Sequence, residues 1–209
     1  MPRSRTFFPA ALLMGLALAL PAEGAERAAN AVFLVAKREL RDPNFRETVV
    51  LVTHPGRGGP FGVIINRPLA RRVDEIFTEY ESLKGRPETL FFGGPVASGG
   101  LVFLVRGTKP PPGATRFLRD VYLTPDVEQI DALMRRADPL RGLRIYAGHA
   151  GWAPGQLQGE IARGGWHVLP ADAETVFEKD PARIWPELEK RATTKQTGHG
   201  VAPLAALGH

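Results

Sequence analysis

The chain has 209 residues, of which 44% are hydrophobic and 23% charged, and its formal net charge is +5. This composition is that of an ordinary globular protein and excludes a collagen-like or intrinsically disordered chain. The sequence contains no cysteine, which excludes a disulfide framework and thiol catalysis.

The N-terminal 24 residues have the pattern of an export signal. Two arginines precede an apolar run, residues 7–20, which is too short to span a bilayer comfortably. Small residues at Ala22 and Gly24 favour cleavage before Ala25. We therefore predict that residues 1–24 are a removed signal peptide, that the mature protein is periplasmic or secreted, and that no transmembrane segment remains. An N-terminal anchor that is never cut is the alternative.

The first part of the body is predicted to be a strand meander. Apolar and β-branched residues dominate 31–40 and 48–54, and the same pattern continues through 59–69. The glycine-rich loop around Arg57 lacks the Lys-Ser/Thr ending of a phosphate-binding loop, so it is interpreted as a hairpin connection.

Helices and strands then alternate in the middle of the chain. Apolar residues near helical spacing predict a helix over 72–85, ending at Gly85. Strands are expected to return between residues 89 and 124, interrupted by glycine and proline. Thr124 is suited to cap a following helix that begins at Pro125 and carries an apolar stripe as far as Met134.

The stretch from Ala147 to Trp166 is rich in glycine and tryptophan. We predict a buried strand that runs out into a glycine-rich turn, followed by a short helix from Pro154. Gly148 and Gly151 would shape the turn by permitting positive φ or a close backbone approach. Such a turn gathers amide N–H groups and can hold an anion or merely pack.

The C-terminal part is predicted to be a short strand at 167–171 and a helical segment at 174–192. The tail, residues 193–209, is short of packing residues and is predicted to be disordered. The folded body is therefore expected to be one domain, residues 25–192.

Several of these segments resemble the YqgE/AlgH family in order and spacing, from Val32 to Lys190. The specific motifs are N-R-P at 66–68, G-G-P-V at 93–96 and A-G-W-x-x-G-Q-L at 150–157. The resemblance implies a single mixed α+β domain, in which a branched, mostly antiparallel sheet is folded into a pseudo-barrel with flanking helices. It implies no known reaction, although members are commonly labelled transcriptional regulators.

The resemblance maps three stretches onto this chain: 42–44, 66–68 and 148–156. Arg67 follows an apolar strand and is pinned by a proline, so its guanidinium is suited to a carboxylate or phosphate. Pairing with Asp42 or Glu160 is the structural alternative. The full set of ligand- or partner-binding candidates is Asp42, Asn44, Asn66, Arg67, Gly148, His149, Gly151, Trp152, Gln156 and Glu160.

No established catalytic motif stands out in the sequence. The body contains only Ser82 and Ser98 as serines, and neither lies in a G-x-S-x-G elbow. The histidines form no H-x-H or H-E-x-x-H pair, so no metal site is predicted, and no cofactor motif is found.

Three classes of function remain open. The preferred class is a non-catalytic binding or regulatory adaptor of the cell envelope, with an unknown protein or a small acidic ligand as its partner. The second is an enzyme, with hydrolysis as one option, built on Asp42, His149 and Glu160. The third is a DNA-associated regulator. The basic residues form no stripe and no helix-turn-helix is found, so no specific nucleic-acid binding is expected.

Overall fold

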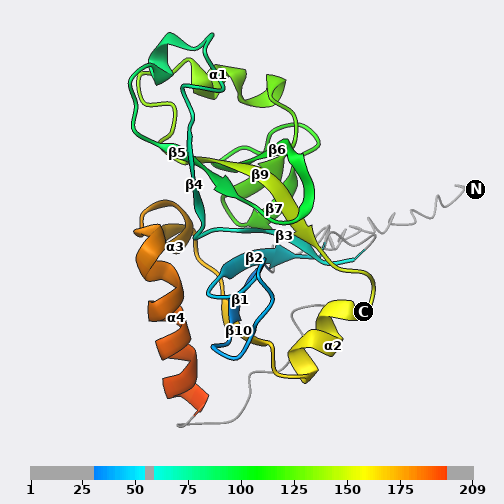
Figure 1. Ribbon diagram of the computed structural model, residues 1–209. Helices are drawn as coiled ribbons and strands as arrows, with labels where there is room; N and C mark the ends of the chain where they lie inside the picture. The colour runs from blue at the N-terminus through cyan, green and yellow to red at the C-terminus, as the bar shows by residue number, and fades with distance from the viewer. Residues whose placement is uncertain (1–30, 55–58, 197–209) are drawn as a thin grey trace, which may run out of the picture.

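The computed structural model describes residues 31–54 and 59–196 (Figure 1). The predicted signal peptide, the loop at Arg57 and the last 13 residues of the predicted tail lie outside the described residues. Its strands are β1 (Val32–Ala36), β2 (Val49–Thr53), β3 (Phe61–Ile64), β4 (Pro68–Arg72), β5 (Thr89–Phe92), β6 (Val96–Arg106), β7 (Thr115–Leu118), β8 (Val121–Thr124), β9 (Leu143–Gly151) and β10 (Trp166–Pro170).

The helices are short except for the last one. They are the 3₁₀ helices η1 (Glu81–Leu83) and η2 (Glu128–Ile130), followed by α1 (Asp131–Met134), α2 (Gln156–Ala162), α3 (Ala173–Phe177) and α4 (Pro181–Gln196). No helix in the described part of the chain is long and apolar enough to cross a membrane.

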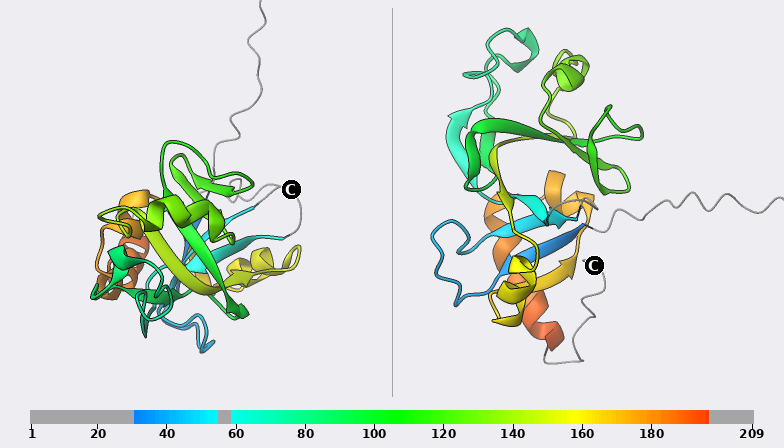
Figure 2. Two further views of the ribbon diagram at one scale, coloured as in Figure 1. Left: turned by 90° about the horizontal axis from the view of Figure 1, so that it is seen from above. Right: turned by 90° about the vertical axis from the view of Figure 1, so that its right-hand side faces the viewer.

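The strands form one branched sheet in the order β10-β1-β2-β3-β9-β6-β8-β7, and the β4–β5 pair joins it at β9. Neighbouring strands are antiparallel except for β5 and β9, which run parallel. Figure 2 shows the sheet curling into a half-barrel. The fold is therefore α+β, as the family resemblance implied, with a branched and mostly antiparallel sheet.

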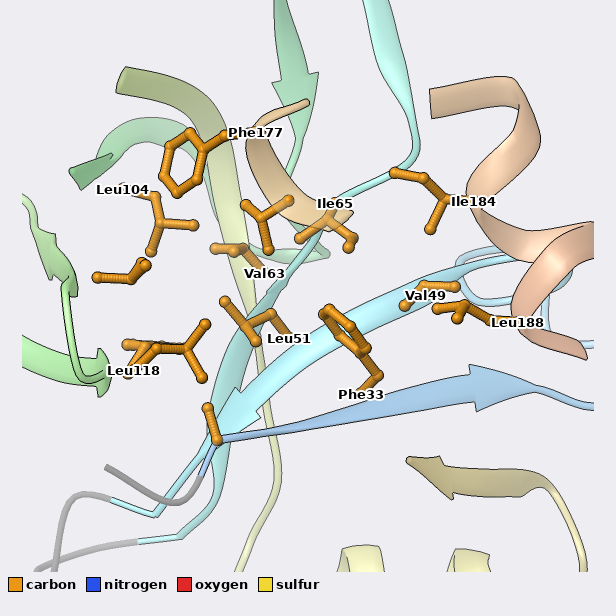
Figure 3. Packing of buried hydrophobic residues seen from close by; sticks show 14 of the residues in the cluster. Phe33, Val49, Leu51, Val63, Ile65, Leu104, Leu118, Phe177, Ile184 and Leu188 are labelled. Carbon is orange, nitrogen blue, oxygen red and sulfur yellow. The ribbon is translucent and has the colours of Figure 1, made fainter. Parts of the chain in front are cut away.

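The central strands β1 and β2 are covered on both faces. On one face, Phe33 and Leu51 pack in a cluster that includes Ile184 and Leu188 of α4 (Figure 3). On the other face, their neighbours pack with Trp152, Trp166 and α2. Strands buried on both faces need apolar side chains at every position, which explains the continuous apolar runs of these two strands. Helix α4 is also attached to β1 by a hydrogen bond that Trp185 Nε1 donates to the carbonyl of Ala36, at 2.7 Å.

The helix predicted over 72–85 is wrong. The segment is a series of separate turns that ends in η1. Its apolar side chains, Val73, Phe77, Tyr80 and Leu83, are nevertheless buried together in a core cluster with Phe103 and Met134. Successive turns place residues three or four apart on one side, as a helix does, so the spacing alone did not distinguish the two structures.

Two other boundaries differ from the prediction. The helix expected after Pro125 is divided into η2 and α1, and its predicted cap Thr124 is the last residue of β8. Thr124 still acts locally, because its hydroxyl accepts a hydrogen bond from the N–H of Asp126 at 3.1 Å. Helix α4 continues to Gln196 and so includes the first four residues of the tail that was predicted to be disordered.

Candidate functional site

Residues 42–47 form a loop between β1 and β2 in which every backbone carbonyl accepts a hydrogen bond; we call it the clamped loop. The carbonyl of Asp42 accepts from the N–H groups of Phe45 and Arg46, at 3.0 and 2.8 Å. The carbonyl of Phe45 accepts from the N–H and the hydroxyl of Thr48, at 3.2 and 2.7 Å. The other four carbonyls accept from two side chains outside the loop.

Arg67 binds three of these carbonyls. Its Nη1 donates to the carbonyl oxygens of Asn44, at 2.8 Å, and Pro43, at 3.4 Å, and its Nη2 donates to that of Arg46, at 3.0 Å. The guanidinium also lies over the ring of Phe92, 5.8 Å from its centroid. Desolvation, with a smaller contribution from the charge of Arg46, lowers the pKa of Arg67 from its ordinary value. Arg67 therefore holds the loop in shape.

The ion pair considered for Arg67, with Asp42 or Glu160, is not formed. Both carboxylates accept hydrogen bonds elsewhere: Asp42 Oδ1 from the N–H of Asn44 at 2.8 Å, and Glu160 from the N–H groups described below. The physical reason is local, since a fork of N–H donors that faces several loop carbonyls satisfies them all at once.

Asn66 clamps the end of the same loop. Its Nδ2 donates to the carbonyl of Glu47 at 3.0 Å, and its Oδ1 accepts from the N–H of Val49 at 2.8 Å. Glu47 has φ +55°, a backbone conformation that residues other than glycine rarely adopt. The amide of Asn66 bridges the residues on either side of Thr48, and this contact helps to maintain the strained position.

Phe45 of the clamped loop packs in a cluster of aromatic rings around one carboxylate. We call it the tryptophan–carboxylate cluster, and its members are Phe45, Trp152, Trp166 and Glu160. Glu160 Oε2 accepts hydrogen bonds from both indole N–H groups, at 3.1 Å from Trp152 and 3.0 Å from Trp166. Phe45 stacks on Trp152 and meets the edge of Trp166, with centroid distances of 6.0 and 5.6 Å. Both tryptophans are buried, so the cluster anchors the clamped loop to the core.

Gln156 completes this arrangement at the start of α2. Its Nε2 donates to Glu160 Oε1 at 3.1 Å, and its Oε1 accepts from the N–H of Ala153 at 3.0 Å. Gln156 and Glu160, both candidate binding residues, thus bind to each other within the protein. Gly155, which precedes the helix, has φ +79°.

The stretch from Ala147 to Trp166 has the predicted order of strand, turn and short helix, but the strand β9 continues to Gly151 before the turn begins. Gly148 has φ +69°, and a Cβ there would lie 2.5 Å from the carbonyl oxygen of Gly94, so the predicted need for glycine is confirmed. For Gly151 the prediction is wrong. This residue lies within β9, and a Cβ there would meet only a methyl of Val96, at 4.0 Å. The chain leaves the strand one residue later, at Trp152.

The structure brings six of the predicted residues into one connected network: Asn44, Asn66, Arg67, Trp152, Gln156 and Glu160. Asp42 begins the clamped loop itself. Gly148, His149 and Gly151 lie along β9, where His149 is half-buried and meets Phe61 edge-on at 6.4 Å. No group of three or more metal-ligating side chains occurs in the described ranges.

Two members of the network were not predicted. Phe45 is an apolar residue in an otherwise polar loop, and that contrast was the available signal. Trp166 stands at the end of the glycine-rich stretch, but its partner Glu160 is six residues away, and only the chain reversal after α2 brings them together.

The sequence is similar to those of known proteins over nearly all of the described part. The sequence profile of the AlgH-like family matches residues 33–196. A UPF0301 protein from Streptomyces avermitilis is 37% identical over 163 residues, which cover 76% of this chain and 83% of that protein. A UPF0301 protein from Thermobifida fusca is 38% identical over 168 residues, with 76% and 84% covered.

Two solved structures share the fold. A crystal structure of a protein from Corynebacterium diphtheriae matches with a TM-score of 0.64 at 23% identity, covering 84% of this chain and 87% of that one. The solution structure of the AlgH protein from Pseudomonas aeruginosa matches with a TM-score of 0.64 at 22% identity, covering 87% and 99%. At these identities the likeness concerns the fold and not the activity.

Proposed function

The chain belongs to the AlgH-like family, and we propose that it is a non-catalytic binding protein of the cell envelope that presents the clamped loop to a protein partner. Family membership gives the fold but no reaction. The observation that carries the proposal is the complete hydrogen bonding of the loop carbonyls from Asp42 to Glu47. A loop already held in one shape loses little conformational entropy on binding, which favours affinity.

The side chains of the clamped loop support a protein partner. Asp42, Pro43, Arg46 and Glu47 are exposed, while the backbone beneath them is fixed by Arg67 and Asn66. A rigid surface of mixed charge with a proline suits a complementary protein surface better than a single small anion. Arg67 contributes to binding indirectly, because it sets the shape of the surface.

A catalytic use of the same residues has less support. Glu160, proposed as a carboxylate catalyst in the enzyme alternative, already accepts hydrogen bonds from Trp152, Trp166 and Gln156. A general base needs a lone pair that is free to reach a substrate proton. The geometry of Glu160 is that of a structural anchor.

The binding proposal can be tested with a charge reversal. Arg46→Glu reverses the charge of an exposed side chain and keeps the backbone carbonyl that Arg67 binds. Tagged protein carrying a photo-crosslinker at Pro43 would be isolated from envelope extract. We expect a discrete crosslinked partner that is lost with Arg46→Glu and kept with the matched control Arg136→Glu, another exposed arginine. The same crosslinks with both variants, at unchanged melting temperatures, would contradict the proposal.

The envelope location is a separate part of the proposal, supported by the apolar run and the small residues before Ala25. Cell fractionation and N-terminal sequencing should find a mature chain that begins near Ala25 outside the inner membrane. Full-length protein in the cytosol would exclude this location and would favour the regulator class.

A measurement of nucleic-acid binding distinguishes the proposed binding protein from a DNA-associated regulator. We expect the mature protein to bind duplex DNA only weakly and without sequence preference, with affinity that collapses as salt rises. A titration at physiological salt measures this. Sequence-selective binding at nanomolar concentration would identify a DNA-associated regulator.

A further inference from the structure

A second region, separate from the clamped loop, contains a cavity of about 260 Å³. It lies where the β4–β5 branch meets the first half of β9 and the start of α4. Most of its lining is apolar: Pro68, Val73, Pro87, Phe91, Leu140, Leu143, Ile145 and Pro181. Protein pockets that hold small molecules are mostly apolar with a few polar groups.

Two charged side chains of opposite sign, Glu88 and Arg144, line the same cavity. They form no ion pair with each other, since the only ion pair of Glu88 within the described residues is a long one, with Arg86 at 3.8 Å. Neither charge neutralises the other, so each can pair with a group of a bound molecule.

Glu88 has an unsatisfied acceptor. The Glu88 side chain is 42% exposed, its Oε2 accepts no hydrogen bond from the described residues, and its Oε1 forms only the long ion pair with Arg86. A carboxylate with so few partners inside the protein keeps lone pairs that can accept hydrogen bonds from a bound molecule. An N–H donor from a ligand would satisfy it, and a cationic ammonium group would do so best.

Arg144 supplies the complementary charge. Its guanidinium lies 5.6 Å from the centroid of the Phe177 ring and donates to the carbonyl oxygens of Leu143 and Phe177. These two bonds fix the side chain in the cavity wall, and they leave other N–H groups of the guanidinium to donate to an anion. A carboxylate is the anion that matches this fork.

From these observations we propose that the cavity binds a free α-amino acid with an apolar side chain. Its ammonium group pairs with Glu88, its carboxylate with Arg144, and its side chain lies against the proline and aliphatic walls. The size of the cavity indicates a small ligand, because about 260 Å³ lies just below the roughly 300–1,000 Å³ of typical ligand pockets. A small metabolite therefore fits, and a dinucleotide does not.

The test uses the full mature chain and isothermal titration with L-leucine, and then with three incomplete analogues. Glycine keeps both charges without the side chain, 3-methylbutylamine keeps only the ammonium group, and 4-methylpentanoate keeps only the carboxylate. We expect saturable binding of L-leucine and affinities at least about tenfold weaker for each analogue, since every one of them lacks a charge-assisted or apolar contact. Absence of L-leucine binding at millimolar concentration, or equal binding of any analogue, would overturn the proposal.

A variant locates the site. Glu88→Gln keeps the shape of the side chain and removes its charge, so L-leucine should bind about tenfold more weakly or worse. The matched control is Glu81→Gln, which removes an exposed carboxylate outside the cavity and should leave the affinity unchanged. Binding that is unaffected by Glu88→Gln would place the amino acid elsewhere and refute the assignment. The outcome is independent of the partner proposed for the clamped loop.

Discussion

The clamped loop and the cavity beside β4 and β5 differ in how fully their polar groups are hydrogen-bonded within the protein. In the clamped loop, even exposed backbone carbonyls are bonded to dedicated side chains of Asn66 and Arg67. At the cavity, a carboxylate oxygen of Glu88 is covered and has no partner within the described structure. Both regions contain an arginine that binds backbone carbonyls, but only the cavity also contains a carboxylate that accepts no hydrogen bond within the described structure.

This difference separates residues that maintain the folded shape from residues that are available to bind a ligand. A polar group that is satisfied within the protein contributes stability, and its loss is felt by folding. A polar group without a partner inside the protein is available to water or to a ligand. Mutations in the two regions should therefore affect different measurements, namely unfolding in the first and binding in the second.

The largest effect is expected at Gly148, because β9 connects the two regions. Gly148→Ala would place a Cβ about 2.5 Å from the backbone carbonyl of Gly94, at a positive φ. Backbone strain of about 1–3 kcal/mol plus a clash that only backbone movement relieves should lower the free energy of unfolding by about 3 kcal/mol or more. Urea unfolding measures this loss.

The control for this variant is Gly151→Ala, three residues along the same strand. Its Cβ meets only a methyl group of Val96, at ordinary contact distance, so the change should stay within about 0.5 kcal/mol. Equal losses at the two positions would mean that any side chain disturbs β9, and that the fit at Gly148 is not specific.

The next largest effect is expected from a substitution that disturbs only the clamped loop. Arg67→Ala removes the donors of three carbonyls, which water replaces only in part because the guanidinium is half-buried. We expect the free energy of unfolding to fall by about 2–3 kcal/mol, whereas L-leucine binding at the cavity should persist. Thermal or urea unfolding provides the test.

Arg67→Lys is the informative companion. It keeps the positive charge but lacks the planar fork, so a single ammonium group cannot reach all three carbonyls, and an intermediate loss is expected. Wild-type stability for Arg67→Ala would mean that the guanidinium is available to a ligand, and the comparison between the two regions would fail.

A smaller effect is expected at the base of the clamped loop. Glu160→Gln keeps an oxygen acceptor but removes the charge that strengthens the hydrogen bonds from Trp152 and Trp166. Because charge-assisted hydrogen bonds are roughly twice as strong as neutral ones, we expect a loss of about 1 kcal/mol. Near-ultraviolet circular dichroism of the tryptophans, combined with urea unfolding, would detect it. An unchanged spectrum and stability would show that the carboxylate is not the anchor.

The sequence predicted the architecture better than the roles of individual residues. Continuous apolar runs indicated β1 and β2 directly, because strands covered on both faces need apolar side chains throughout. The branched sheet came from the family resemblance, since no local pattern reports which distant strands pair. The helix over 72–85 failed because successive turns and a helix share the same apolar spacing.

The sequence predicted which segments lie together better than it predicted what their side chains contact. The motifs around Asp42, Asn66 and Trp152 do meet in the fold, but sequence could not show that Arg67 faces carbonyls rather than an open surface. That orientation depends on the path of the loop, which is set by Phe45 packing on Trp152 and Trp166. The cavity was not predicted at all, because Glu88 and Arg144 are 56 positions apart and belong to no motif.

The smallest effect on stability is expected at Glu88, and it is the sharpest test of the comparison. In the absence of ligand, Glu88→Gln removes the charge of a carboxylate whose side chain is 42% exposed, and it removes only a long ion pair with Arg86. A neutral amide is cheaper to bury than a carboxylate, while a surface ion pair contributes at most about 1 kcal/mol. The free energy of unfolding should therefore change by about 0.5 kcal/mol or less, in contrast to Arg67→Ala. If Glu88→Gln instead destabilises the ligand-free protein by as much as Arg67→Ala does, Glu88 stabilises the fold in the same way as Arg67. Its charge would then not be available to a ligand.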